Sequence, residues 1–335
     1  MIEVEHLSKI YGTTQAIADV TFRVEPGEIL GFLGPNGAGK TTTMRILAGY
    51  LPATQGTARV AGFEVHENSM AVRQRIGYLP EHPPLYPDMT VEAFLYFVAR
   101  IKRVPAGDRA EKVRSAMQRC FLAEKAQVSI HKLSKGFRQR VGIAQAIVHD
   151  PPAIILDEPT VGLDPRQIIE VRKLIESMAG DRTVILSTHI LPEASTLCNR
   201  IAILHQGRIV ATDTPEQLQQ RLVSGAGYEV ELEGTPANAE QAITTVRSLP
   251  GIQTVELATN ATLPPNRYLL QVTATAQAEP APEIAASLIA KGMRLHELRR
   301  TRVSLEDVFL TLTTADPQPE ALRAELEGDE SNSCQ

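Results

Sequence analysis

A glycine-rich run near the N-terminus constrains the fold of this chain more than any other feature. Residues 34–41 read Gly-Pro-Asn-Gly-Ala-Gly-Lys-Thr and match the pattern G-x-x-x-x-G-K-[ST] in full. An apolar stretch at 28–33 precedes the run, and a helical pattern at 42–48 follows it and stops at Gly49, a C-terminal capping glycine. In such a strand–loop–helix unit, backbone N–H groups and the helix dipole bind phosphate oxygens. The sequence therefore predicts a phosphate-binding loop in an α/β fold.

Two side chains of this loop have chemical roles of their own. Lys40 is expected to neutralise the outer phosphates of a nucleotide, and the Thr41 hydroxyl is expected to ligate Mg²⁺. The residues predicted to contact the nucleotide here are Gly34, Pro35, Asn36, Gly37, Ala38, Gly39, Lys40, Thr41 and Thr42.

A second apolar run, residues 153–156, follows Pro151-Pro152 and ends in two carboxylates. A short apolar run of this kind suits a parallel strand that is buried on both faces. A carboxylate at the end of such a strand can hold magnesium, directly or through water, and Asp157 takes that role. Glu158 can polarise the attacking water as a general base. Two adjacent carboxylates could also form a solvated turn, but their pairing with the phosphate loop favours the catalytic interpretation.

Length and composition set the broad class. With 335 residues, 43% hydrophobic and 22% charged, the chain suits two unequal globular domains. A formal net charge of -5 argues against nucleic acid as the main partner. Cys120, Cys198 and Cys334 fit no zinc or redox spacing, which favours a reducing compartment. The charged N-terminus does not resemble a signal peptide, and no apolar stretch approaches the roughly 20 residues of a membrane-spanning helix.

The pattern of elements divides the chain. Residues 1–223 form the α/β domain that carries the motifs, with a helical insert at about 83–150. Residues 224–227 read as a linker. Residues 228–314 show the order βαββαβα, which predicts a small α+β, ferredoxin-like accessory domain. Residues 315–335 are polar and acidic, and we expect them to be disordered.

Further motifs resemble those of the ABC ATPases. Residues 133–140, Leu-Ser-Lys-Gly-Phe-Arg-Gln-Arg, are similar to the LSGGQ signature, and residues 161–164 to the D-loop. Residues 187–189, Ser-Thr-His, resemble the switch histidine motif, and Tyr11 stands where the family places an aromatic ring on adenine. With six motifs in the family's order, residues 1–220 are identified as a member of the ABC ATPases.

The resemblance implies a fold and a mechanism. The fold is a P-loop ATPase sheet with an antiparallel β lobe and the helical insert. Two copies, or one copy and a related subunit, would sandwich ATP and Mg²⁺ between the phosphate loop of one and the signature of the other. Ser134 and the Gly136 N–H would contact the γ-phosphate across the interface, with Asp164 of the D-loop beside them. His189 would reach the γ-phosphate in its own subunit, although taken alone it reads as a polar strand-end residue.

Three positions depart from the family pattern. Lys135 replaces the usual glycine of the signature, Phe137 replaces its glutamine, and Glu81 replaces a glutamine that touches the metal and senses the permease. Glu81 can still accept a hydrogen bond from water or ligate magnesium. Alternatively, it can be a solvated loop residue. Such substitutions resemble those of type-2 exporter ATPases of the drug-resistance and gliding-motility groups.

The resemblance implies the ATP-hydrolysing subunit of an exporter, cytoplasmic and held on the inner face of the membrane by a separate integral-membrane permease. Leu85, Tyr86 and Tyr96 are candidate permease contacts, whereas Phe94 belongs to an apolar helix face. The alternative is a non-transport ABC ATPase acting on a soluble or nucleic-acid partner. A single cassette without sustained heptads disfavours that alternative.

The accessory domain also resembles the one that follows the ATPase in type-2 exporters, and we expect it to serve dimerisation or regulation. Its last strand is basic, with Arg294, Arg299, Arg300 and Arg302. This strand could bind an acidic partner, but protection of an exposed sheet edge is the favoured interpretation.

Overall fold

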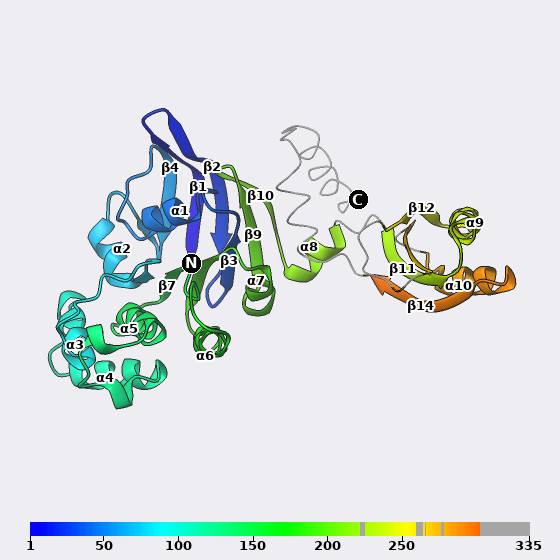
Figure 1. The fold of residues 1–335 in the computed structure, drawn as a ribbon. Helices are drawn as coiled ribbons and strands as arrows, with labels where there is room; N and C mark the ends of the chain where they lie inside the picture. Colours follow the sequence, from blue (N-terminus) through cyan, green and yellow to red (C-terminus); the bar gives the residue numbers. More distant parts are fainter. Residues whose placement is uncertain (222–224, 259–263, 265, 276–277, 302–335) are drawn as a thin grey trace. The chain divides into compact units, whose positions relative to one another are not determined.

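The computed structural model describes the chain except residues 222–224, 259–263, 265, 276–277 and 302–335 (Figure 1). The chain divides into two compact units, Met1–Pro215 and Glu216–Gln335. The sequence-based boundary was placed at residue 223. Each unit is described by itself.

The first unit is built on a sheet of six strands in the order β10-β9-β3-β8-β7-β6 (Figure 1). Neighbouring strands are parallel except β10, which pairs antiparallel with β9 in a hairpin. Every residue of β3, β7 and β8 is buried, as the apolar runs predicted. The strands are β3 (Ile29–Leu33), β6 (Ile76–Leu79), β7 (Ala153–Asp157), β8 (Thr183–Thr188), β9 (Arg200–His205) and β10 (Arg208–Asp213).

A second, antiparallel sheet forms the predicted lobe, in the order β2-β1-β4-β5. Its strands are β1 (Ile2–Tyr11), β2 (Thr14–Val24), β4 (Gln55–Val60) and β5 (Phe63–Glu64). In the first two strands, the apolar alternation of the sequence extends only over residues 2–5 and 20–24. One core joins the lobe to β3 and to helix α1 (Lys40–Leu47), with the rings of Phe22 and Phe32 5.0 Å apart edge to face.

The helical insert contains α3 (Val91–Ile101), α4 (Arg109–Arg119) and α5 (Lys135–Ile147), with the 3-10 turns η1 (Ala123–Lys125) and η2 (Ile130–Lys132). The Thr90 hydroxyl caps α3 by accepting from the N–H of Ala93 at 3.3 Å, as expected. Phe94 is 1% exposed and packs as the predicted core residue. Figure 1 shows these helices gathered at the lower left of the unit.

Shorter helices complete the connections. Helix α2 (Ser69–Arg75) leads into β6, α6 (Pro165–Glu176) joins β7 to β8, α7 (Leu191–Leu197) joins β8 to β9, and α8 (Pro215–Arg221) follows β10. In the part of the chain that the structure describes, we find no helix with the length and apolarity needed to cross a bilayer.

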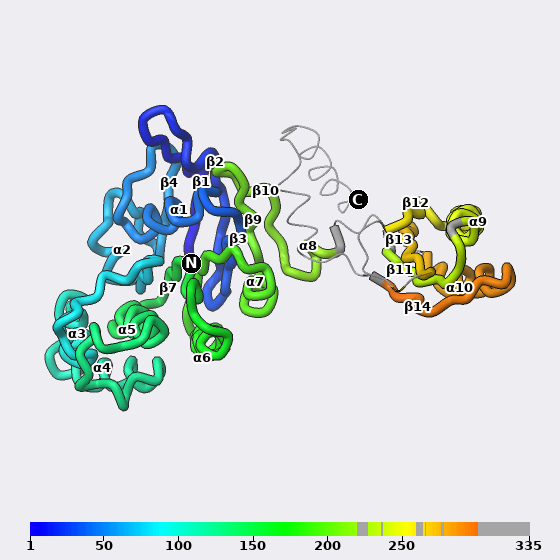
Figure 2. The backbone as a smooth tube through the Cα atoms, viewed as in Figure 1, coloured from blue at the N-terminus to red at the C-terminus, as the bar shows by residue number. Residues whose placement is uncertain are grey.

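The second unit contains one antiparallel sheet in the order β12-β13-β11-β14 (Figure 2). Its elements run β11 (Gly225–Glu233), α9 (Pro236–Arg247), β12 (Ile252–Leu257), β13 (Arg267–Thr275), α10 (Ala281–Ala290) and β14 (Arg294–Thr301). Both helices contribute to one core with the sheet, through Val246 of α9 and Leu288 of α10. The predicted ferredoxin-like α+β architecture is therefore present.

Two predictions for this unit need comment. Residues 225–227, read as linker, are the start of β11 and pair with Thr273–Thr275 of β13 through the partners Gly225↔Thr275 and Gly227↔Thr273. That part of the linker prediction is wrong, because strand pairing overrides a glycine-rich sequence. The predicted helix at 305–312 and the tail at 315–335 lie outside the described residues.

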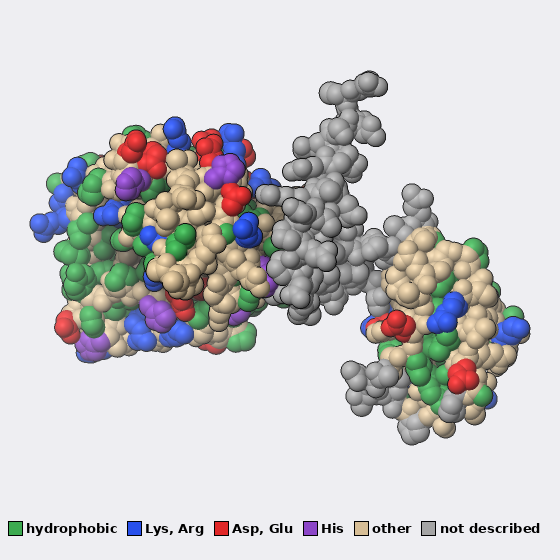
Figure 3. Space-filling model, turned by 90° about the horizontal axis from the view of Figure 1, so that it is seen from above, with side chains coloured by type: hydrophobic (Ala, Val, Ile, Leu, Met, Phe, Trp, Pro, Cys, Tyr) green, Lys and Arg blue, Asp and Glu red, His purple; other side chains and the backbone are tan. Residues whose placement is uncertain are grey.

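The basic strand β14 is an edge strand of its sheet, which agrees with the interpretation that its arginines protect an exposed edge. Arg294 Nη1 lies 3.3 Å from Glu233 Oε1, Arg300 Nη1 lies 3.2 Å from Glu279 Oε1, and Arg299 pairs with Glu229. Carboxylates of the same unit thus engage these guanidinium groups, and Arg302 lies outside the described residues. On the face seen in Figure 3, basic and acidic side chains are interspersed.

Candidate active site

The predicted motifs meet where three neighbouring strands of the large sheet end. Leu33 of β3 pairs with Thr188 of β8, and Asp157 of β7 pairs with Ser187 of β8. A cleft of about 430 Å³ opens beyond these strand ends. Its lining residues are Ala16, Pro35, Asn36, Gly37, Ala38, Gly39, Lys40, Thr41, Thr42, Glu81, Glu158, Val161 and His189. The structure thus brings together the phosphate loop, Glu81, Glu158 and the switch histidine.

Glycine is required at two points of the phosphate loop. A Cβ on Gly34 would lie 2.5 Å from the Leu204 carbonyl oxygen. At Gly39 the φ angle is +104°, and a Cβ would lie 2.8 Å from the Ala16 carbonyl oxygen. Gly39 also caps α1 without any side-chain hydrogen bond, so the first N–H groups of the helix face the cleft as anion donors.

The Lys40 ammonium is held inside the loop. The residue is 6% exposed, and its Nζ donates to the carbonyl oxygens of Gly34 at 2.6 Å and Pro35 at 3.2 Å. Glu158 Oε1 lies 3.5 Å away. A buried cation so close to the loop can exchange a carbonyl contact for a phosphate oxygen and remain compensated.

Asp157 offers an oxygen suited to a cation. The residue is fully buried, and its Oδ1 accepts from Ser187 Oγ at 2.6 Å and from Thr41 Oγ1 at 3.2 Å. Its buried Oδ2 has no hydrogen-bond partner. An unpaired buried carboxylate oxygen is costly, and a hard cation with oxygen ligands would relieve that cost.

The described residues contain no cluster of three or more His, Cys, Asp or Glu side chains that could form a cage for a metal. One carboxylate and one hydroxyl fit Mg²⁺ instead, which takes few protein ligands and completes its shell with phosphates and water.

Glu158 has an unusual backbone conformation, with φ +49°. Its N–H donates to Ser187 Oγ at 2.9 Å, and its Oε2 lies 2.9 Å from His189 Nδ1. The His189 side chain is 47% exposed, whereas that of Glu158 is 8% exposed. Both residues line the cleft, where the imidazole is open to solvent and the carboxylate is largely shielded from it.

A tyrosine behind Asp157 stays neutral. Burial, with the charge of Asp157 as the second cause, raises the pKa of Tyr78 to about 12. Its phenol therefore adds no negative charge beside the carboxylate.

The predicted signature residues Ser134 and Gly136 and the D-loop residue Asp164 do not line this cleft, although Val161 of the D-loop does. Ser134 caps α5 and is exposed, and Asp164 caps α6 by accepting from Gln167 N–H at 3.0 Å. Gly136 is buried, and a Cβ there would lie 2.4 Å from the Gln167 side chain. The structure therefore places Ser134, Gly136 and Asp164 together, but apart from the phosphate loop of their own chain.

The three residues that depart from the family pattern lie near the signature and the D-loop. The Nζ of Lys135 lies over Gly162 of the D-loop, only 1.9 Å from where a Cβ would stand. Lys135 and Glu81 both line a second cavity of about 360 Å³, together with Leu85 and Arg138. Phe137 has the guanidinium of Arg140 5.1 Å from its ring centroid.

Two other groups of predicted residues lie away from the cleft lining. Tyr11 is 46% exposed at the end of β1, with Lys9 Nζ 5.3 Å from its ring centroid. Tyr86 is 53% exposed and its ring contacts Phe94 at 6.0 Å and Phe97 at 5.4 Å. Tyr96 is half-buried on α3.

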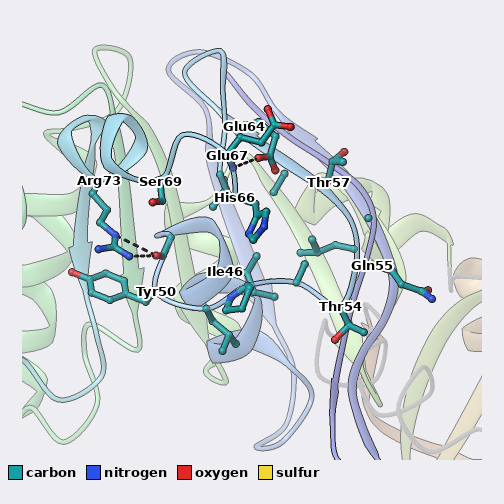
Figure 4. Close-up of a pocket in the computed structure, with 18 residues that line it drawn as sticks. Ile46, Tyr50, Thr54, Gln55, Thr57, Glu64, His66, Glu67, Ser69 and Arg73 are labelled. Atoms are coloured by element: carbon teal, nitrogen blue, oxygen red, sulfur yellow. Dashed lines mark hydrogen bonds between the residues drawn. The ribbon is translucent and has the colours of Figure 1, made fainter.

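A separate cavity of about 650 Å³ lies between α2 and the antiparallel lobe (Figure 4). Arg73 donates from Nε to the Gly49 carbonyl oxygen at 3.2 Å, and its guanidinium lies 5.3 Å from the Tyr50 ring centroid. None of the predicted site residues lines this cavity.

Sequence reasoning missed two side chains of the site. Ser187 was read only as part of the switch motif, yet its hydroxyl bonds both Asp157 and Glu158. Glu193 is 1% exposed beside Thr188 and Thr160, with no local sequence signal to distinguish it from a solvated helix residue.

This geometry defines a P-loop nucleotide hydrolase whose signature lies outside its own cleft. A family model described as ABC transporter matches residues 17–161. The linearmycin resistance ATP-binding protein LnrL of Bacillus subtilis (strain 168) is 30% identical over 314 residues, 93% of this chain and 98% of that protein. The Nod factor export ATP-binding protein I of Paraburkholderia xenovorans (strain LB400) is 37% identical over 219 residues, 65% of this chain and 72% of that protein.

Solved structures agree. An ATP-binding subunit of an ABC transporter superposes with a TM-score of 0.61 at 31% identity, covering 66% of this chain and 92% of that chain. A dimeric cassette bound to ADP and Pi has a TM-score of 0.60 at 23% identity, covering 64% and 98%, and shows the fold alone.

The chain therefore belongs to the ABC transporter ATP-binding proteins. It is an ATP-hydrolysing transporter subunit, and its match to a resistance ATP-binding protein over nearly the full length is consistent with the type-2 exporter class. None of these findings favours the non-transport alternative.

Proposed function

We propose that this chain hydrolyses ATP with Mg²⁺ in a head-to-tail dimer and thereby drives export through a separate membrane permease. The observation that supports the dimer most is the divided site. Glu158 and His189 line the cleft of the phosphate loop, whereas Ser134 and Gly136 do not. A second chain, identical or related, would supply the missing signature. A relative of the same fold is dimeric.

In this dimer, the loop N–H groups and Lys40 bind the β- and γ-phosphates, and Tyr11 would have to approach adenine from the end of β1. Asp157 and Thr41 would hold Mg²⁺, with Glu81 near it, and the ion would offset charge on the phosphates. Glu158 accepts a proton from the attacking water. His189 holds Glu158 in place and donates toward the γ-phosphate in the transition state.

The partner signature closes the site. The Ser134 hydroxyl and the Gly136 N–H contact the γ-phosphate from the second chain, with Asp164 beside them. Closure around ATP and opening after hydrolysis provide the mechanical output.

Export and the permease are inferred from relatives. One relative is named for linearmycin resistance and another for Nod factor export. We infer that this chain is cytoplasmic and binds the inner face of the membrane through an integral-membrane permease. Leu85, Tyr86 and Tyr96 form the proposed contact, because two of them are exposed or border a cavity beside Glu81. The mechanism requires no nucleic acid.

We further propose that residues 1–223 are the ATPase domain and that residues 228–314 form the accessory domain for dimerisation or regulation. The paired charges along β14 support edge protection over binding of an acidic partner.

The first test captures partners with tagged Glu158→Gln protein, which should bind ATP without hydrolysing it. Detergent-solubilised membranes of the native host would be mixed with this variant in ATP, and in ADP as the control. We expect a polytopic membrane protein in stoichiometric amount with ATP. Recovery of only soluble or nucleic-acid partners, with the dimer intact, would overturn the transport proposal.

A second test examines the divided site. Lys40→Ala removes the phosphate-loop cation, and Ser134→Arg blocks the signature. Each variant alone should be inactive, but their mixture should regain hydrolysis, because a mixed dimer contains one intact composite site. No recovery in mixtures that form heterodimers would contradict the head-to-tail arrangement.

A further inference from the structure

The first turn of α7 buries a carboxylate that contacts neither the cleft nor the loop. Glu193 is 1% exposed. Its Oε2 accepts from Thr160 Oγ1 at 2.7 Å and from Thr188 Oγ1 at 3.1 Å. Arg172 Nη2 of α6 lies 3.4 Å from its Oε1 and compensates the charge. One oxygen atom therefore receives two hydroxyl groups from different segments.

These two segments carry the catalytic pair. Thr160 follows Glu158 by two residues and directly precedes the D-loop, and Thr188 directly precedes His189. The Thr188 hydroxyl also accepts from the N–H of Ile190 at 3.0 Å, so it fixes the backbone on both sides of the histidine.

The ladder between β7 and β8 ends before the catalytic pair. The last paired residues of β7 and β8 are Asp157 and Ser187, so Glu158 and His189 lie beyond the ladder. Glu158 also has a strained φ of +49°. A strained residue at the end of a strand persists only when its surroundings fix it.

On the basis of the catalytic roles proposed above for Glu158 and His189, we propose that Glu193 is a positioning residue for hydrolysis. Its buried carboxylate joins Thr160, just before the D-loop, to Thr188 of the switch segment and keeps His189 Nδ1 within 2.9 Å of Glu158 Oε2. A purely structural role would not need this carboxylate, since burying an ion pair is seldom better for stability than packing apolar side chains.

The test removes single hydroxyl donors in the full-length protein. Thr160→Val and Thr188→Val keep the side-chain size and delete one hydrogen bond each. We expect kcat to fall about 10- to 100-fold in each, as for small misplacements of reacting groups. The KM and the Kd for ATP should change little, because the phosphate loop is untouched. The double variant should lose less than the product of the single losses, since both hydroxyls act through one oxygen.

Conservative variants separate positioning from folding. Thr160→Ser retains a hydroxyl and should recover most of kcat. Glu193→Gln retains an oxygen acceptor and should lose less kcat than Glu193→Ala, even where both lower the melting temperature. Glu176→Ala, which removes an exposed carboxylate from the end of α6, serves as the matched control.

Two results would overturn the proposal. One is a kcat within about twofold of wild type in both valine variants. The other is a loss of kcat that matches an equal loss of ATP binding or of folded protein in every variant, Thr160→Ser included.

Discussion

His189 Nδ1 lies 2.9 Å from Glu158 Oε2, although these residues follow different strands and are separated by 31 positions. The same glutamate has its other oxygen 3.5 Å from the Lys40 ammonium. One carboxylate thus lies between the His189 imidazole and the Lys40 ammonium.

Removing either member of this pair should abolish turnover and spare binding. Glu158→Gln keeps the side-chain volume but cannot take a proton, and His189→Ala removes a donor to the transition state. We expect a fall in kcat of at least about 100-fold for each. Phosphate release and fluorescent nucleotide binding would measure the two effects, with exposed Glu124→Gln as control. Turnover near that of wild type in Glu158→Gln would contradict the general-base role.

The orphan oxygen of Asp157 predicts the metal dependence. Chelation by EDTA should stop hydrolysis, and excess Mg²⁺ should restore it. Asp157→Asn removes the charge but keeps the contacts of one oxygen. The variant should therefore need a higher Mg²⁺ concentration for half-maximal rate, with a lower maximum. A Mg²⁺ titration of ATPase rate checks this, and an unchanged midpoint would argue against Asp157 as the ligand.

The close contact between Gly136 of the signature and Gln167 predicts that a variant can regain stability without regaining ATP hydrolysis. In Gly136→Ala the new Cβ meets the Gln167 side chain, which should cost about 1–3 kcal/mol of stability. Adding Gln167→Ala removes that contact and should restore the melting temperature. Hydrolysis should stay low in the double variant, because the partner's phosphate must still approach the backbone at residue 136. Recovery of turnover together with stability would show that the glycine serves only its own chain.

A buried histidine predicts acid sensitivity. His149 Nε2 lies 3.1 Å from the Ile76 carbonyl oxygen, which also accepts from Lys102 Nζ at 3.0 Å. Burial, then the charge of Lys102, lowers the pKa of His149 from 6.5 to about 3. Between these values the unfolded chain binds a proton that the folded chain does not. Stability should therefore fall as the pH drops from 6.5 toward 3.

Melting temperatures between pH 4 and 7 would test this expectation. His149→Asn should flatten the dependence, whereas the exposed His66→Asn should leave it as in wild type. An equal slope in His149→Asn would assign the acid sensitivity to other groups.

Burial also lowers the pKa of Lys102 to about 8, so by the same rule stability should rise with pH between 8 and 10.5.

Local signals explain why much of the ATPase fold could be predicted. The phosphate loop, the buried strands β3, β7 and β8, and the capped helix α3 each depend on neighbouring residues, and the structure contains all of them. Six motifs in the family's order identified the family from the sequence. The roles of the individual site residues stay predictions.

The antiparallel hairpin shows where local signals fail. Polar residues, His6 in β1 and Asp19 in β2, interrupt the apolar alternation of the two strands. Both have positive φ angles, of 50° and 55°, and they mark irregularities that the pairing of β1 with β2 absorbs. Their side chains meet at 2.7 Å, a contact between residues 13 positions apart that periodicity does not report.

Burial of polar residues was equally hidden. Glu193 follows a proline at the start of a short helix and reads as solvated. Only the packing of α7 against β8 and against α6 places its carboxylate between two threonines.

The strand order has a consequence for synthesis of the chain. β8 lies between β3 and β7 but is the last of the three to leave the ribosome. A nascent chain that ends before residue 183 has both the phosphate loop and the two carboxylates, but no strand to join them. Insertion of β8 between β3 and β7 requires contacts between residues that are far apart in the sequence. We therefore expect this insertion to be a slow folding step. We expect a growing polypeptide to have no hydrolytic centre until the signature helix α5 and the D-loop have been made, so that no fragment lacking them consumes ATP.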